Sequence, residues 1–119
     1  MNAKFIQYLQ EPLYEYANLD FVDTGLKDIV IHVYSQGDTK VQHGPRIKVS
    51  NVYGKFSRED NFVIDITNKN VVEGKCKLST KEYNKILEWI DLNRIVILKY
   101  WNSHGEMLTR ELYSNVRKL

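Results

Sequence analysis

The sequence predicts an α+β domain: a small antiparallel sheet of three to four strands, arranged as a meander, with N-terminal and C-terminal helices packed on one face. Between residues 28 and 72, short segments rich in β-branched residues alternate apolar and polar side chains and are separated by turn residues. After residue 79, apolar residues recur at helical spacing instead. Grouped strands followed by helices are typical of α+β proteins, and alternating strands bury only one face.

The first predicted element is a helix over residues 3–18. Pro12 lacks a backbone N–H, so we expect a kink or two short helices at this point. An Asp-Thr-Gly turn at residues 23–25 then leads toward the first strand. The apolar residues that recur at helical spacing are Phe5, Ile6, Leu9, Leu13 and Tyr16.

Strands are predicted at residues 28–34, 46–51, 61–67 and 71–72. The second segment alternates most clearly. Ile47 and Val49 are predicted to point inward, because they share one side of the strand. Arg46, Lys48 and Ser50 are predicted to point outward.

The C-terminal helical region begins at Ser79, which is predicted as an N-cap with Glu82 completing a capping box. The apolar stripe shifts phase just before Asn93, so Asn93 is predicted to cap a second helix. A short last helix is predicted to be capped by Thr109. The residues predicted to face the sheet are Tyr83, Ile86, Leu87, Ile90, Ile97, Leu98 and Trp101.

The 119 residues predict a single domain, residues 1–119. Hydrophobic residues make up 43% and charged residues 27% of the chain, as is typical of a globular domain with its own core. No apolar run approaches the roughly 18 residues of a membrane span. The N-terminal apolar stretch is too short and broken for a signal peptide, and the single Cys76 is typical of a reducing compartment. We therefore expect a cytoplasmic protein with no membrane partner.

Residues with catalytic or metal-binding chemistry are few. None of the three histidines (His32, His43 and His104) is spaced from another like the ligands of a known zinc site. The sequence matches no Walker loop, dinucleotide fingerprint or nucleophile elbow. We therefore expect neither a metal nor a cofactor, and His32 is predicted to be exposed or packed at a sheet edge.

His43 provides an alternative, catalytic interpretation. It precedes a predicted strand whose outward face carries Arg46 and Lys48. A general base beside two cations would suit the cleavage of an RNA phosphodiester.

Aromatic and cationic residues indicate a recognition surface, because tyrosine and arginine are over-represented in such surfaces. Packing at helical spacing explains most of the eight tyrosines, but not Tyr34 and Tyr53. The latter begins a long polar connection over residues 53–60. The net charge is only +2, and the positive excess falls after residue 30, which mildly favours an anionic partner. The predicted binding residues are Tyr34, Arg46, Lys48, Tyr53, Phe56 and Arg58.

Several segments carry a family resemblance: His43 to Val49, Asp65-Ile66, Val71-Val72-Glu73-Gly74, Leu87-Glu88-Trp89-Ile90, Asn93-Arg94, Leu98 and Trp101. With these, residues 28–102 resemble a family of small bacterial proteins described only as a domain of unknown function. Its members are often encoded in gene pairs that look like toxin–antitoxin modules or mobile-element cargo. The resemblance implies a small protein that acts through a partner.

The leading hypothesis is a non-enzymatic interaction module that binds a protein partner with the sheet face left free by the helices. A homodimer through an edge strand or the helix pair is compatible with it, and nucleic acid is an alternative partner. Two other functions stay open. One is a small toxin-type ribonuclease that uses His43; the other is a phage- or plasmid-encoded inhibitor of a host defence complex.

Overall fold

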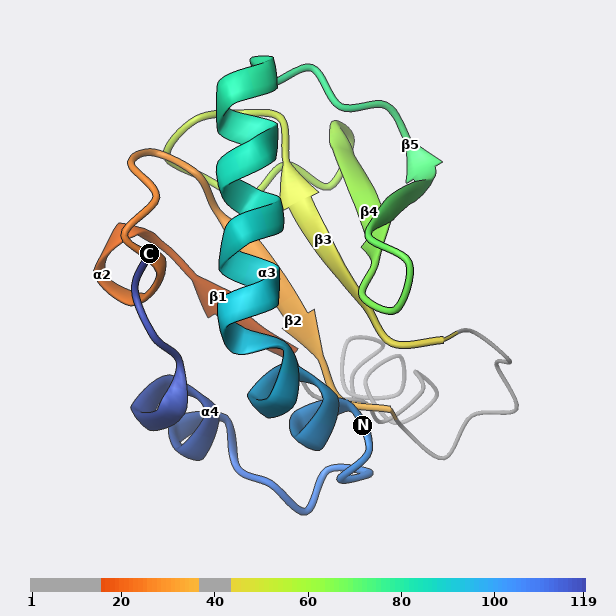
Figure 1. Cartoon of the computed structure of the whole chain (residues 1–119), viewed down its shortest axis with the longest axis vertical. Coiled ribbons are helices and arrows are strands. Elements are labelled where there is room, and N and C mark those ends of the chain that lie inside the picture. Colours follow the sequence, from red (N-terminus) through yellow and green to blue (C-terminus); the bar gives the residue numbers. More distant parts are fainter. Residues whose placement is uncertain (1–15, 37–43) are drawn as a thin grey trace, which may run out of the picture.

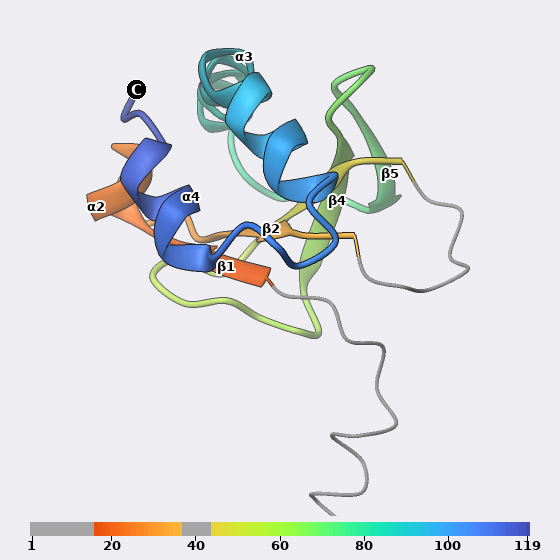
Figure 2. The same cartoon turned by 90° about the horizontal axis from the view of Figure 1, so that it is seen from below.

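The computed structural model describes residues 16–36 and 44–119 of the chain. Its elements are β1 (Tyr16–Leu19), α2 (Phe21–Thr24), β2 (Ile31–Tyr34), β3 (Arg46–Ser50), β4 (Asn61–Asp65), β5 (Asn70–Gly74), α3 (Thr80–Trp101) and α4 (Thr109–Asn115). The five strands form one sheet in the order β1-β2-β3-β4-β5, and every neighbouring pair is antiparallel. Both α3 and α4 lie on one side of this sheet (Figure 1, Figure 2). The predicted α+β class and the meander are confirmed.

The sheet has five strands rather than the predicted three to four, and β1 was missed. It pairs with β2, with Ala17 opposite Val33. The prediction that residues 16–18 end a helix is wrong, because Ala17 and Leu19 are buried and alternate with the exposed Tyr16. This period of two belongs to a strand. The rest of the predicted N-terminal helix lies outside the described residues.

The core lies between the sheet and α3. The inward side chains of β1, β2, β3 and β4 are fully buried, including Ile47 and Val49 as predicted. Each large apolar side chain buried in this way contributes about 1.5–3 kcal/mol. The fully buried residues that α3 adds to the core are Ile86, Trp89, Ile90 and Tyr100, with Ile97 at 1% exposure.

The helix α3 is one continuous helix of 22 residues, and it begins with the predicted capping box of Ser79 and Glu82. The predicted second start at Asn93 is wrong. Asn93 is buried, and its side-chain amide donates to the carbonyl oxygens of Trp89, at 3.0 Å, and Arg117, at 2.9 Å. Its oxygen accepts from the backbone N–H of Arg117 at 2.6 Å. Asn93 therefore interrupts the apolar stripe because it binds the C-terminal segment, and it does not start a second helix.

The last described segment packs closely on α2. The residue before α4 that caps it is Leu108 rather than Thr109. After α4, the backbone N–H of Leu119 donates to the carbonyl of Thr24 at 2.8 Å. Gly25 has a φ of +75°, and a Cβ there would lie 2.8 Å from the carbonyl oxygen of Leu119. Both the backbone conformation and the close contact therefore require glycine at this position.

The edge strand β1 is bound by a side chain of α4. The Tyr113 hydroxyl accepts from the backbone N–H of Asn18 at 3.1 Å and donates to its carbonyl at 2.9 Å. Because β1 has a strand neighbour only on the β2 side, these backbone groups would otherwise lack a strand partner. One tyrosine thus satisfies both.

Candidate binding surface

We call the side of the sheet away from α3 the open face. Alternate residues of the strands point to it, and the cross-strand register aligns Asn18, His32, Lys48, Val63 and Glu73 in one row across all five strands. The connection between β3 and β4, coloured yellow-green, passes on this side of the sheet in Figure 2. The open face therefore consists of alternate strand residues with one long loop lying across part of them.

Four rings, Tyr16, His32, Tyr34 and Phe56, form what we call the aromatic cluster. His32 stacks on Phe56 with ring centroids 3.5 Å apart and planes 11° apart, and on Tyr16 at 4.7 Å and 28°. It meets Tyr34 edge-on at 6.2 Å. Strand pairing places two of the rings side by side, because Tyr16 lies directly opposite Tyr34.

The loop that carries Phe56 is held against the sheet by Ser50. The Ser50 hydroxyl donates to the carbonyl of Lys55 at 2.8 Å and accepts from the backbone N–H groups of Val52 and Ser57, each at 3.1 Å. Ser50 was predicted to point outward into solvent, but this network buries it to 1% exposure. The network fixes the loop on both sides of Phe56.

Two cations, Lys48 and Arg58, lie beside the aromatic cluster. The Lys48 ammonium is 5.3 Å from the ring centroid of Tyr34, within range of a cation–π interaction. Burial, together with the charges of Lys48 and Arg58, lowers the pKa of His32 from 6.5 to about 4. His32 is therefore a neutral ring at physiological pH.

Arg46 has a different role from Lys48, although both lie on β3. Its guanidinium forms an ion pair with Glu73 of β5 at 3.2 Å and is only 16% exposed. The pair spans β4, and Val63 of that strand is 2% exposed. Among the described residues, the Arg46 Nε has no hydrogen-bond partner. The Arg46 charge is thus committed to the fold.

The structure brings together some of the predicted binding residues and separates others. Tyr34, Lys48 and Phe56 lie around His32, the charge of Arg58 acts on it, and Arg46 lies farther along the open face. Tyr53 does not join them, because its hydroxyl donates to Glu82 near the start of α3 at 2.8 Å. This hydrogen bond raises the pKa of Tyr53.

The sequence did not point to two members of the aromatic cluster, Tyr16 and His32. The signal for Tyr16 was the alternation over residues 16–19, which competes with a helical pattern that ends at the same residue. The signal for His32 was its position on the outward side of a strand, like Lys48. His43, the candidate base of the ribonuclease hypothesis, lies outside the described residues.

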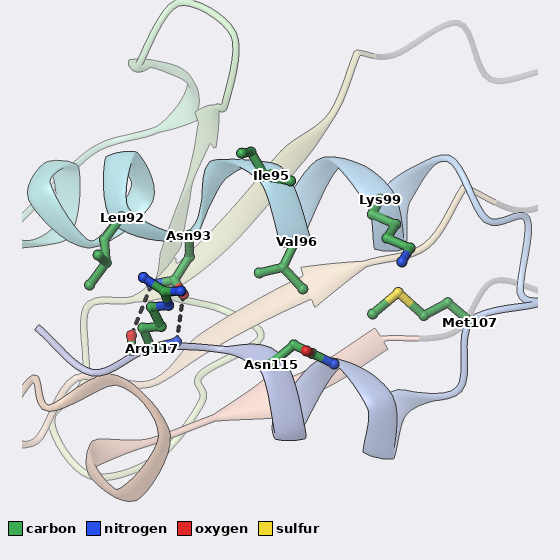
Figure 3. Close-up of a pocket in the computed structure, with 8 residues that line it drawn as sticks. All are labelled: Leu92, Asn93, Ile95, Val96, Lys99, Met107, Asn115 and Arg117. Carbon is green, nitrogen blue, oxygen red and sulfur yellow. Dashed lines mark hydrogen bonds between the residues drawn. The ribbon is translucent and has the colours of Figure 1, made fainter.

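A concave region lies between α3 and the C-terminal segment, away from the open face (Figure 3). It has a volume of about 350 Å³. Its amide, Asn93, is already bonded to Arg117, as the dashed lines in Figure 3 show. The Ile95 side chain is 85% exposed, and in Figure 3 it points away from Met107 and Asn115. The groove is lined by Leu92, Asn93, Ile95, Val96, Lys99, Met107, Asn115 and Arg117.

The described residues also bear on metal binding and on membrane crossing. Within residues 16–36 and 44–119, no three His, Cys, Asp or Glu side chains gather closely enough to hold a metal ion. In the same described ranges, no helix has the length and apolar character that crossing a membrane requires.

Comparisons with protein-family models, curated proteins and solved structures each gave no match to this chain. The family resemblance inferred from the sequence therefore stays a prediction.

Proposed function

We propose that this chain is a non-enzymatic binding module that holds a macromolecular partner on the open face of its sheet. The observation that carries the proposal is the aromatic cluster with Lys48 and Arg58 beside it. The cluster lies on the side of the sheet that the helices leave uncovered. Partly exposed rings next to cations are the composition of recognition surfaces.

The exposure of Tyr16 and the fixed position of Phe56 support a binding role. Tyr16 is a large ring that contacts two other rings, and it is nevertheless 49% exposed. The Ser50 network places Phe56 on His32 and not in the core between the sheet and α3. A loop that needed only to connect β3 to β4 would not require a ring at that position.

The described groups of the open face favour binding over catalysis. With a pKa of about 4, His32 is a weak base at neutral pH and cannot act as an acid there. The Asp65 carboxylate accepts from the backbone N–H of Thr67 at 2.8 Å and is part of the turn after β4. The ribonuclease hypothesis depends on His43 and stays a prediction. Growth arrest and RNA cleavage on induction of the chain in bacteria would support it.

Affinity capture with matched variants tests the proposal. The tagged chain is compared with the triple variant Tyr16→Thr, Lys48→Gln, Arg58→Gln, which removes one ring and two charges from the open face. The control is Tyr53→Thr, Lys81→Gln, Lys85→Gln, which removes the same groups from exposed positions elsewhere. Proteins and nucleic acids retained from a native lysate are both identified.

The expected result is at least one macromolecule that the wild type and the control retain and that the open-face variant loses about tenfold or more. Circular dichroism must show that all three fold, with melting temperatures within about 4 °C. An open-face variant that folds and retains the same macromolecules in the same amounts would overturn the proposal.

A further inference from the structure

We propose that the partner on the open face is single-stranded nucleic acid, with bases stacked on the aromatic cluster and phosphates paired with Lys48 and Arg58. This inference rests on the proposed function, because it names the class of molecule that the same surface binds. RNA and DNA share this chemistry, and the experiment below separates them.

The arrangement of the rings fits unpaired bases. His32 and Phe56 are nearly parallel, and Tyr16 lies within 28° of His32, so three rings already form a stack. Tyr16 is 49% exposed and offers an accessible ring surface to which a flat base can add. Stacking on aromatic side chains accepts any base, because every base has a π-face. Bases within a duplex are stacked on each other and cannot reach these rings.

The electrostatics of the same region fit a phosphate backbone. Within the described residues, neither Lys48 nor Arg58 forms an ion pair with a carboxylate, whereas Arg46 does. The strand carboxylates of the open face, Asp65 and Glu73, lie on β4 and β5, and β3 separates them from the rings of β1 and β2. The strands that carry the rings thus have no carboxylate among their described residues and have Lys48 beside them, while the loop that carries Arg58 also holds the exposed Glu59. His32 adds no charge there at neutral pH but keeps its ring surface.

A protein partner fits this surface less well. The fully buried centre of a protein interface is more apolar than the rest of the protein surface. The aliphatic residue of the open face, Val63, is 2% exposed and lies under the Arg46–Glu73 pair. Of the exposed aliphatic side chains among the described residues, Val22 lies on α2, Val72 on β5, Leu92 and Ile95 on α3, and Leu108 and Leu119 lie on either side of α4. Among the described residues, the strands that carry the rings and Lys48 thus offer no exposed aliphatic side chain for such a centre.

Fluorescence anisotropy with labelled oligonucleotides of about ten nucleotides tests the inference. The probes are oligo(U) RNA, oligo(dT) DNA and a DNA duplex of equal length, added to the purified full-length chain. We expect micromolar binding to one or both single strands and binding to the duplex about tenfold weaker or less. The difference between the two single strands shows which sugar is preferred.

The variants separate stacking from nonspecific attraction. Tyr16→Thr should weaken single-strand binding about five- to 100-fold, the effect of losing one stacked base, and Tyr16→Phe should restore it. Lys48→Gln should weaken binding and reduce the slope of log affinity against log salt by about 0.7. The matched changes Tyr53→Thr and Lys85→Gln should leave affinity unchanged.

Three results would overturn the inference: no single-strand binding at protein concentrations of about 100 μM, equal binding to the duplex, or an equal loss with Tyr16→Thr and Tyr53→Thr. The lysate experiment distinguishes this failure from failure of the proposed function. If the open-face variant loses a captured protein that nuclease treatment does not release, the binding module stands and the nucleic-acid inference is wrong. If nothing captured depends on the open face, both are wrong.

Discussion

The two faces of the same sheet differ completely in composition and in role. On β2 and β3, Ile31, Val33, Ile47 and Val49 are fully buried under the helices. The residues that alternate with them are His32, Tyr34, Arg46 and Lys48, all partly exposed. Because successive strand residues point to opposite faces, one set holds the fold together while the other is free to vary in chemistry. Substitutions at two successive residues of a strand are therefore expected to affect different properties, the stability of the fold at one and the chemistry of the open face at the other.

The faces also differ in how their rings are held. On the covered face, Trp89 and Tyr100 are fully enclosed by aliphatic side chains and the helix. On the open face, Phe56 and Tyr16 are only partly buried and stack on His32. Substitutions on the covered face should thus lower stability, and those on the open face should lower binding.

Replacing Trp89 by alanine should give the largest effect. It removes a fully buried ring from the covered face, so the free energy of unfolding should fall by about 3–5 kcal/mol. Urea unfolding followed by circular dichroism measures it. Trp89→Phe should cost much less, because the Trp89 indole N–H has no hydrogen-bond partner among the described residues. Equal costs for the two variants would show that the ring does not fill the core.

Replacing Asn93 by alanine should have the next largest effect. It leaves the backbone N–H and C=O of Arg117 without their partner and should cost about 1–3 kcal/mol. Hydrogen exchange at the Arg117 and Leu119 amides should accelerate more than exchange in β3. The control is Asn84→Ala, an exposed asparagine on α3, which should change neither measurement.

Lowering the pH should destabilise the fold through the open face. Since the pKa of His32 falls from 6.5 to about 4 on folding, the unfolded chain binds the proton first as pH decreases. The stability due to the neutral ring is present above about pH 6.5 and is lost as the pH falls toward about 4. After allowance for solvent screening, the loss is on the order of 1–2 kcal/mol.

His32→Phe isolates this contribution, because it keeps a stacking ring that cannot be protonated. Urea unfolding at about pH 7.5 and about pH 4.5 should show a smaller pH dependence for the variant than for the wild type. Taking the difference between the two proteins cancels the carboxylates that titrate in the same range. An identical pH dependence in both proteins would exclude a lowered His32 pKa.

Replacing Glu73 by glutamine should have the smallest effect on stability, about 0–1 kcal/mol, because the Arg46–Glu73 pair is partly exposed. The same change frees the positive charge of Arg46 on the open face. It should therefore raise the affinity for single-stranded oligonucleotides slightly, most visibly at low salt. Lower affinity would mean that Arg46 is not available to a phosphate.

Local patterns in the sequence predicted much of the fold. The alternation of Ile47 and Val49 with Arg46 and Lys48 gave the correct faces of β3, because strand periodicity is set within a few residues. The capping box of Ser79 and Glu82 gave the start of α3 for the same reason. Structure that depends on residues close together in the sequence can therefore be predicted from the sequence.

The features that were missed depend on distant partners. Asn93 interrupts the apolar stripe of α3, and only its bonds to Arg117, 24 residues away, explain why the helix continues. The strand β1 forms because β2 offers it an edge. The aromatic cluster joins two strands and a loop, so the sequence pointed to Tyr34 and Phe56 but not to Tyr16 and His32, which the fold brings beside them.

The hydrogen bonds of Tyr113 to the Asn18 backbone also have a consequence for self-association. An unprotected edge strand can recruit a strand from a second molecule and extend the sheet into dimers or aggregates. Here the phenol occupies the groups through which β1 would add another strand. Sheet extension through β1 would first require α4 to withdraw, so Tyr113→Phe should leave the monomer folded but make it more prone to aggregate. Light scattering over time would show this.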